Sequence, residues 1–192
     1  MLSLRLKPDY SSKGGQKGGG GFNASAMAAA SWQDVAFLEA VAEDATDRKI
    51  LDAKRRNLIG FGEGGATAQR VLREGSSGRY GAFASIAGAL YAVAEAAENA
   101  PLCLLFGAVN PTNPLNGGEI YTPWSGQILA PAAAKAIHGW RVGLGCPENL
   151  GEASLKNGVH RNEWRDCLGN GALQATWMER LGRQWPGTGA GP

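Results

Sequence analysis

The chain has 192 residues, and its 19 lysines and arginines nearly balance its 17 aspartates and glutamates, which leaves a net charge of +2. A chain this close to neutrality gives no argument for a nucleic-acid-binding protein, and its length suits one domain of ordinary size. No run of 18 apolar residues occurs, so the sequence predicts no transmembrane helix. Glycine is the unusual component, because 29 residues are about twice the average share of roughly 7%.

Composition divides the chain into four parts. Residues 1–24 form a basic, glycine-rich arm and residues 186–192 a short tail, and we expect both to be flexible because ordering glycine costs much backbone entropy. Residues 25–118 are predicted to form a helical core with a glycine-rich loop. Residues 119–185 are predicted to hold loops and short helices, with five of the six tryptophans. We expect the basic arm to be a solvated tail, and a weak contact with nucleic acid is the alternative.

Apolar spacing predicts the elements in chain order. Apolar spacing of three and four residues, proline at a first turn or a terminating glycine predicts helices in seven segments: 31–46, 46–57, 66–74, 81–98, 131–140, 162–169 and 172–182. Three short apolar runs are ambiguous: 58–62, 80–85 and 102–107. We therefore predict a mostly helical protein with a few short strands and glycine-rich tails. The alternative is a three-layer α/β unit of Rossmann type over residues 57–110, which requires the three short runs to pair in parallel.

One motif carries the alternative. Gly60, Gly62 and Gly65 spell G-x-G-x-x-G, and "LIGFGEGGATAQRVL" resembles the first strand, loop and helix of nicotinamide-dependent dehydrogenases. The resemblance covers residues 57 to 110. It implies a small dinucleotide-binding oxidoreductase linked to NADP, with the three glycines at the pyrophosphate and Arg79 at the 2′-phosphate.

Two observations oppose that interpretation. In a chain so rich in glycine, the bare spacing is expected by chance. The acidic residue that binds the ribose hydroxyls about 20 positions later is also missing, because position 83 is phenylalanine with apolar or small neighbours. The competing interpretation is a glycine-rich turn between helices.

The remaining reactive residues form no recognisable set. His160, Glu163 and Cys167 have the spacing of one helix face, but no fourth metal ligand lies at a recognisable distance. We therefore predict no catalytic residue and no metal site. Cys146 and Cys167 are far enough apart to pair, but three cysteines without a secretory signal favour reduced thiols. A reducing intracellular compartment or a virion is therefore expected rather than secretion.

The tryptophans suggest contact with other proteins. Trp124, Trp140 and Trp185 each adjoin glycine or proline, so their rings must find packing partners elsewhere, and tryptophan is enriched in interface hot spots. We predict an interface formed by Trp124, Trp140, Trp177 and Trp185, and a small local core is the alternative. Together with the flexible ends, this predicts a non-enzymatic structural or accessory subunit of a larger assembly, either a virion component or part of a multiprotein complex. Its expected partners are other protein subunits or copies of itself, and no cofactor is expected.

Overall fold

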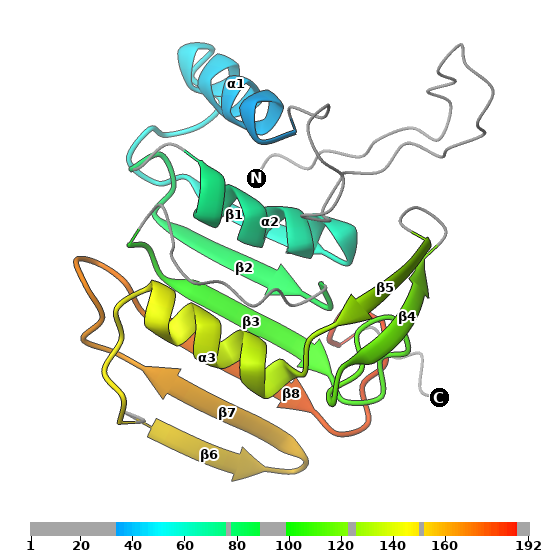
Figure 1. Cartoon of the computed structure of the whole chain (residues 1–192). Helices are drawn as coiled ribbons and strands as arrows, with labels where there is room; N and C mark the ends of the chain where they lie inside the picture. Colours follow the sequence, from blue (N-terminus) through cyan, green and yellow to red (C-terminus); the bar gives the residue numbers. More distant parts are fainter. Residues whose placement is uncertain (1–33, 76–77, 89–98, 123–125, 150–151, 188–192) are drawn as a thin grey trace, which may run out of the picture.

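The computed structural model of the chain describes residues 34–75, 78–88, 99–122, 126–149 and 152–187 (Figure 1). These residues contain three helices: α1 (Asp34–Asp47), α2 (Glu63–Glu74) and α3 (Ala133–Gly143). They also contain eight strands: β1 (Asn57–Phe61), β2 (Ala82–Ile86), β3 (Leu102–Gly107), β4 (Gly118–Thr122), β5 (Gly126–Ala130), β6 (Glu152–Lys156), β7 (Val159–Trp164) and β8 (Leu173–Met178).

Six of these strands form one mixed sheet in the order β1-β2-β3-β8-β7-β6. Neighbours from β1 through β3 to β8 are parallel, whereas β7 and β6 continue the sheet antiparallel as a meander with β8. Strands β4 and β5 form a separate antiparallel hairpin near the carboxyl ends of the parallel strands (Figure 1). The last strand in the sequence therefore lies in the middle of the sheet.

The prediction of a mostly helical chain is wrong. The three short apolar runs are strands β1, β2 and β3, and the predicted helix at 172–182 contains β8. Short apolar runs fit both periods, and pairing with neighbouring strands decided between them. The α/β alternative over 57–110 is confirmed in its main requirement, because β1, β2 and β3 pair in parallel. Its three-layer form is not seen among the described residues, where α2 and α3 lie on the same face and β8, β7 and β6 extend the sheet beyond that unit (Figure 1).

Several predicted helices are confirmed and others are not. Helices α1, α2 and α3 overlap the predicted segments 31–46, 66–74 and 131–140, although α2 begins three residues earlier and α3 ends three residues later than predicted. Residues 46–57 contain the end of α1, a connection of turns and bends, and the first residue of β1, whereas residues 162–169 contain the end of β7 and a loop. Of the predicted helix at 81–98, residues 82–86 form β2, and 89–98 lie outside the described residues, as do the predicted arm at 1–24 and most of the tail.

The core lies between the sheet and the helices α2 and α3. Inward-facing residues of the central strands are almost completely buried, as are residues on both helices: Val71, Leu72, Leu102, Leu104, Phe106, Ala136, Trp140, Leu173 and Ala175. The described helices are too short or too polar to cross a membrane.

Two of the three cysteines are joined. Cys146, just after α3, forms a disulfide with Cys167, in the loop between β7 and β8, and Cys103 on β3 is free. The expectation of reduced thiols is therefore wrong for this pair. The bond ties the end of α3 to the antiparallel part of the sheet.

We expect the disulfide to stabilise the fold substantially. The bond spans 21 residues, and the entropy of closing such a loop in the unfolded chain corresponds to about 3 kcal/mol. Replacing Cys167 with serine should lower the urea midpoint accordingly, whereas Cys103→Ser, as a control, should change it by much less. Three titratable thiols in the denatured, unreduced protein would contradict the pairing.

Candidate functional site

The glycine motif forms the turn from β1 into α2, at the carboxyl ends of the parallel strands (Figure 1). Each glycine has its own steric reason. A Cβ on Gly60 would overlap the carbonyl group of Gly64, and Gly62 has φ of 57°, a conformation that other residues rarely adopt. A Cβ on Gly65 would lie 3.1 Å from the Cα of Gly88, in the loop after β2. The motif therefore serves a tight turn and close packing between α2 and the β2 loop.

Two backbone amides at this turn are used by internal hydrogen bonds. The Gly62 amide donates to the carbonyl oxygen of Ile86 at 2.9 Å, and the Ala66 amide donates to that of Gly62 at 3.2 Å. A Cβ on Gly88 would lie only 2.7 Å from the Ala66 nitrogen. The loop after β2 therefore packs closely against the first turn of α2. In a dinucleotide-binding protein, the pyrophosphate binds at this end of the helix.

A charged pair from distant parts of the chain also meets at the turn. The segment after β8 places Arg183 against Gly62, with its Nη2 3.2 Å from the position of a Cβ there. Glu63, the first residue of α2, is half-buried. Burial raises the pKa of its carboxyl group, and the charge of Arg183 opposes that rise. The chain itself therefore supplies both charges beside this helix start.

The structure does not bring Arg79 to the glycine motif. Arg79 precedes β2, so it lies at the opposite end of that strand, and its guanidinium faces Glu43 of α1 at 3.5 Å. Five strand residues separate the two ends by about 16 Å. The residue directly after β2 is Ala87, which offers no carboxylate to a ribose. The geometry therefore does not place Arg79 where the NADP interpretation needs a cation for the 2′-phosphate, and Ala87 offers no acid for the ribose of NAD either.

Behind the turn, a buried chain of hydrogen bonds joins both helices to the sheet. Trp140 of α3 donates from Nε1 to Oε1 of Gln69 on α2 at 3.0 Å. The Gln69 amide nitrogen donates to the hydroxyl of Ser85 on β2 at 2.9 Å. All three residues are at most 1% exposed. These bonds satisfy polar groups that would otherwise be costly to bury.

The four tryptophans predicted to form an interface lie in different environments. Trp140 is completely buried and belongs to the core, not to the surface. Trp177 is partly buried, with its ring stacked between those of Phe106 and His160. Trp185 is 44% exposed and packs against Phe61, with ring centroids 5.9 Å apart. Trp124 lies outside the described residues.

The side of the sheet opposite α2 and α3, which we call the open face, carries apolar side chains on β1, β2 and β3. The pairing register places Phe61, Ile86 and Leu105 in one row across β1, β2 and β3. Ile59, Ala84 and Cys103 form the neighbouring row. Ile59 is 55% exposed and Phe61 38%, and the others are partly exposed. No described helix covers these rows (Figure 1).

Charged residues occupy the other half of the open face. Arg161 and Glu163 of β7 form an ion pair at 2.9 Å, and Arg165 approaches the same carboxylate at 3.3 Å. Hydrogen bonds from these arginines lower the pKa of Glu163. Burial raises the pKa of the Cys103 thiol, and the nearby Arg161 charge opposes that rise. The open face is therefore apolar over β1–β3 and charged over β7.

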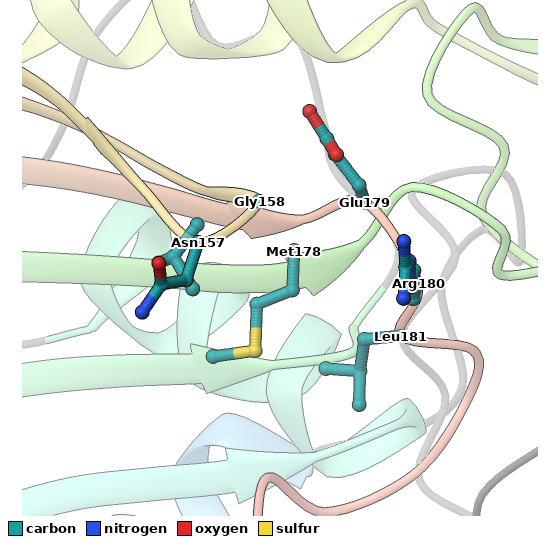
Figure 2. Close-up of a pocket in the computed structure, with 7 residues that line it drawn as sticks. Asn157, Gly158, Met178, Glu179, Arg180 and Leu181 are labelled. Carbon is teal, nitrogen blue, oxygen red and sulfur yellow. The ribbon is translucent and has the colours of Figure 1, made fainter.

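A pocket of about 500 Å³ lies at the end of this face, between the β6–β7 turn and the segment after β8 (Figure 2). Val159, Met178 and Leu181 give it an apolar lining, and Asn157, Gly158, Glu179 and Arg180 complete it. Figure 2 shows the side chains of Met178 and Leu181 pointing to the same side, whereas that of Glu179 points away. The Glu179 carboxylate instead pairs with His160 at 2.9 Å.

The spacing of His160, Glu163 and Cys167 does not produce a metal site. Positions 160 and 163 lie on strand β7, so their side chains face opposite sides of the sheet. Cys167 is bonded to Cys146 in the disulfide. Within the described parts of the chain, no group of three histidine, cysteine, aspartate or glutamate side chains is arranged to hold a metal ion.

Comparison with known proteins gives no further guide to the site, because no protein-family model and no curated protein matches the chain.

Sequence reasoning missed the open face and Arg183. The open face had a signal, since the runs that became β2 and β3 carry apolar or small residues at both odd and even positions, which is typical of strands covered on both sides. No sequence signal pointed to Arg183, because its contact with the glycine turn depends on where β8 ends.

The glycine turn yields a matched pair of substitutions. Gly64 and Gly65 are adjacent in α2, but a Cβ on Gly64 meets nothing within 4 Å, whereas one on Gly65 meets Ser85 and the Gly88 backbone. Gly64→Ala should stabilise the protein by about 0.5–1 kcal/mol through helix propensity, and Gly65→Ala should destabilise it by about 1–2 kcal/mol through overpacking. Urea unfolding measures both, and equal effects would contradict the close packing.

Gln69→Leu should be strongly destabilising. It leaves the buried Trp140 nitrogen and Ser85 hydroxyl without these partners, at about 1–3 kcal/mol for each unsatisfied group. Gln174→Leu is the control, because the Gln174 amide bonds to Thr176 on its own strand and lies on the open face. Thermal unfolding should show a clearly larger loss for Gln69→Leu, and similar losses would mean that the buried chain contributes little.

Proposed function

We propose that this chain is a non-enzymatic subunit of a larger protein assembly, a virion component or part of a multiprotein complex, and that it binds a neighbouring protein through the open face. One observation carries the proposal. The parallel strands β1, β2 and β3 present contiguous apolar side chains on a side of the sheet that no described helix covers.

The physical argument concerns parallel sheets in general. Such sheets occur almost entirely in proteins whose helices cover both faces, and their strands are apolar on both sides for that reason. Here α2 and α3 cover one face, while Ile59, Phe61 and Trp185 keep between 38% and 55% of their surface exposed on or beside the other. A protein partner that covers this face completes the second layer.

The energetic gain from such a contact is appreciable. Complete burial of a large apolar side chain is worth about 1.5–3 kcal/mol, so covering a residue that is already half-buried contributes about 1 kcal/mol. Ile59 and Phe61 together with Trp185 form an aromatic and aliphatic cluster of the kind found at the centres of interfaces. The ion pair of Arg161 and Glu163 lies farther along the same face, where a partner meets a polar rim.

The test is the size of the particle that contains the full chain. In an extract of cells that make it, the wild-type chain should sediment well above its 20.0 kDa monomer mass. Ile59→Glu should shift it towards the monomer, because the new charge would be buried in the contact. Val142→Glu is the matched control, since Val142 is 49% exposed on α3, away from the open face.

A wild-type chain that sediments as a monomer contradicts the proposal, and so does an equal shift for both variants. Circular dichroism of the purified variants establishes that each is folded before its sedimentation is compared.

A further inference from the structure

Strand β6 is the terminal strand of the six-stranded sheet. It pairs only with β7 among the described strands, so one whole edge of its backbone faces no other described strand. In Figure 1 it lies at the end of the sheet opposite β1 and α1. An edge of this kind carries a row of N–H and C=O groups that can pair with a strand from another chain.

The sequence of β6 is complementary to itself in the antiparallel direction. The strand reads Glu152-Ala153-Ser154-Leu155-Lys156. If two copies pair antiparallel about Ser154, Ala153 comes opposite Leu155, and Lys156 comes opposite position 152 of the other copy, which is a glutamate. We propose that two copies of this chain associate through β6 in this register and join their sheets across a two-fold axis.

An exposed apolar side chain at this edge supports a partner strand there. Leu155 is 64% exposed, although it stands in the same row as the packed residues His160 and Trp177. A charge on an edge strand usually keeps other chains away. In this strand the lysine at one end and the glutamate at the other are compensated in one antiparallel register, because each lysine then meets a glutamate.

The second copy follows from the symmetry of the arrangement. An interface across a two-fold axis must use the same patch on both partners and must be self-complementary. Both the charges and the small-to-large pairing of Ala153 with Leu155 meet that requirement. The inference rests on the proposed assembly role, but it uses a surface separate from the open face.

Cysteine cross-linking tests the register directly in the full chain carrying Cys103→Ser. Residues that pair directly in antiparallel strands have Cα atoms about 4.5–5.5 Å apart, which suits a disulfide. Ser154→Cys should therefore form a cross-linked dimer under mild oxidation. Ala153→Cys is the control, because its two copies are offset by two residues, about 8 Å apart, and it should cross-link at least tenfold more slowly.

A charge swap provides the second measurement. Lys156→Glu places like charges opposite each other at both ends of the paired strands, and the dimer dissociation constant measured by sedimentation should rise at least about tenfold. Adding Glu152→Lys to that variant restores opposite charges, and the dissociation constant should return close to that of the starting protein.

The outcomes separate this inference from the proposed function. A purified chain that stays monomeric at high concentration overturns the β6 dimer and leaves the open face as the assembly surface. A dimer that Ser154→Cys does not cross-link, or that tolerates Lys156→Glu, also overturns the register. An intact β6 dimer together with no effect of Ile59→Glu on particle size would instead remove the role of the open face.

Discussion

The fold depends on how closely α2 can approach β2. Gly65 and Gly88 allow two backbones to meet without intervening side chains, and this closeness brings Gln69 within hydrogen-bonding distance of Ser85. Gln69 in turn accepts the indole N–H of Trp140, so α3 is held beside α2 on the same side of the sheet. These three side chains are buried, and their polar groups bond to one another. Placing the two helices on opposite faces of the sheet would leave those groups buried without partners, which costs free energy.

The side on which the helices lie determines which surfaces remain available. With α2 and α3 on one side, the apolar rows of β1–β3 have no described helix on the other. The last three strands add a second surface, since the meander from β8 through β7 ends in β6, whose outer edge pairs with no other described strand. Within the described residues, one face of the sheet has no covering helix and one edge has no neighbouring strand, which is consistent with a subunit whose structure is completed by neighbours. The two surfaces are distinct enough to be used at once.

Some of this could be predicted from the sequence and some could not. The three described helices follow from local signals, namely apolar spacing in α1, the glycine-containing stop after α2 and Pro131 just before α3. The steric roles of Gly60 and Gly65 follow from the motif. The β6–β7 hairpin also had a signal that was not used, because Asn157 and Gly158 both have positive φ and form the Asn-Gly turn that favours two-residue hairpins. Strand β8 had no decisive local signal, since its spacing fits a helix as well as a strand, and its conformation is set by pairing with β3 and β7.

The glycine turn shows why a spacing motif predicts geometry better than it predicts a ligand. A dinucleotide site needs a tight turn, a helix packed closely on the next strand, and open space before the first turn of that helix. The first two needs are steric, and glycine meets them here as it would in a dehydrogenase. The third depends on what the rest of the chain places there. In this protein, Arg183 lies against Gly62 and Gly88 lies close to the Ala66 amide, so the same three glycines serve packing. The contacts of this protein with other molecules are therefore better sought on the open face and on β6.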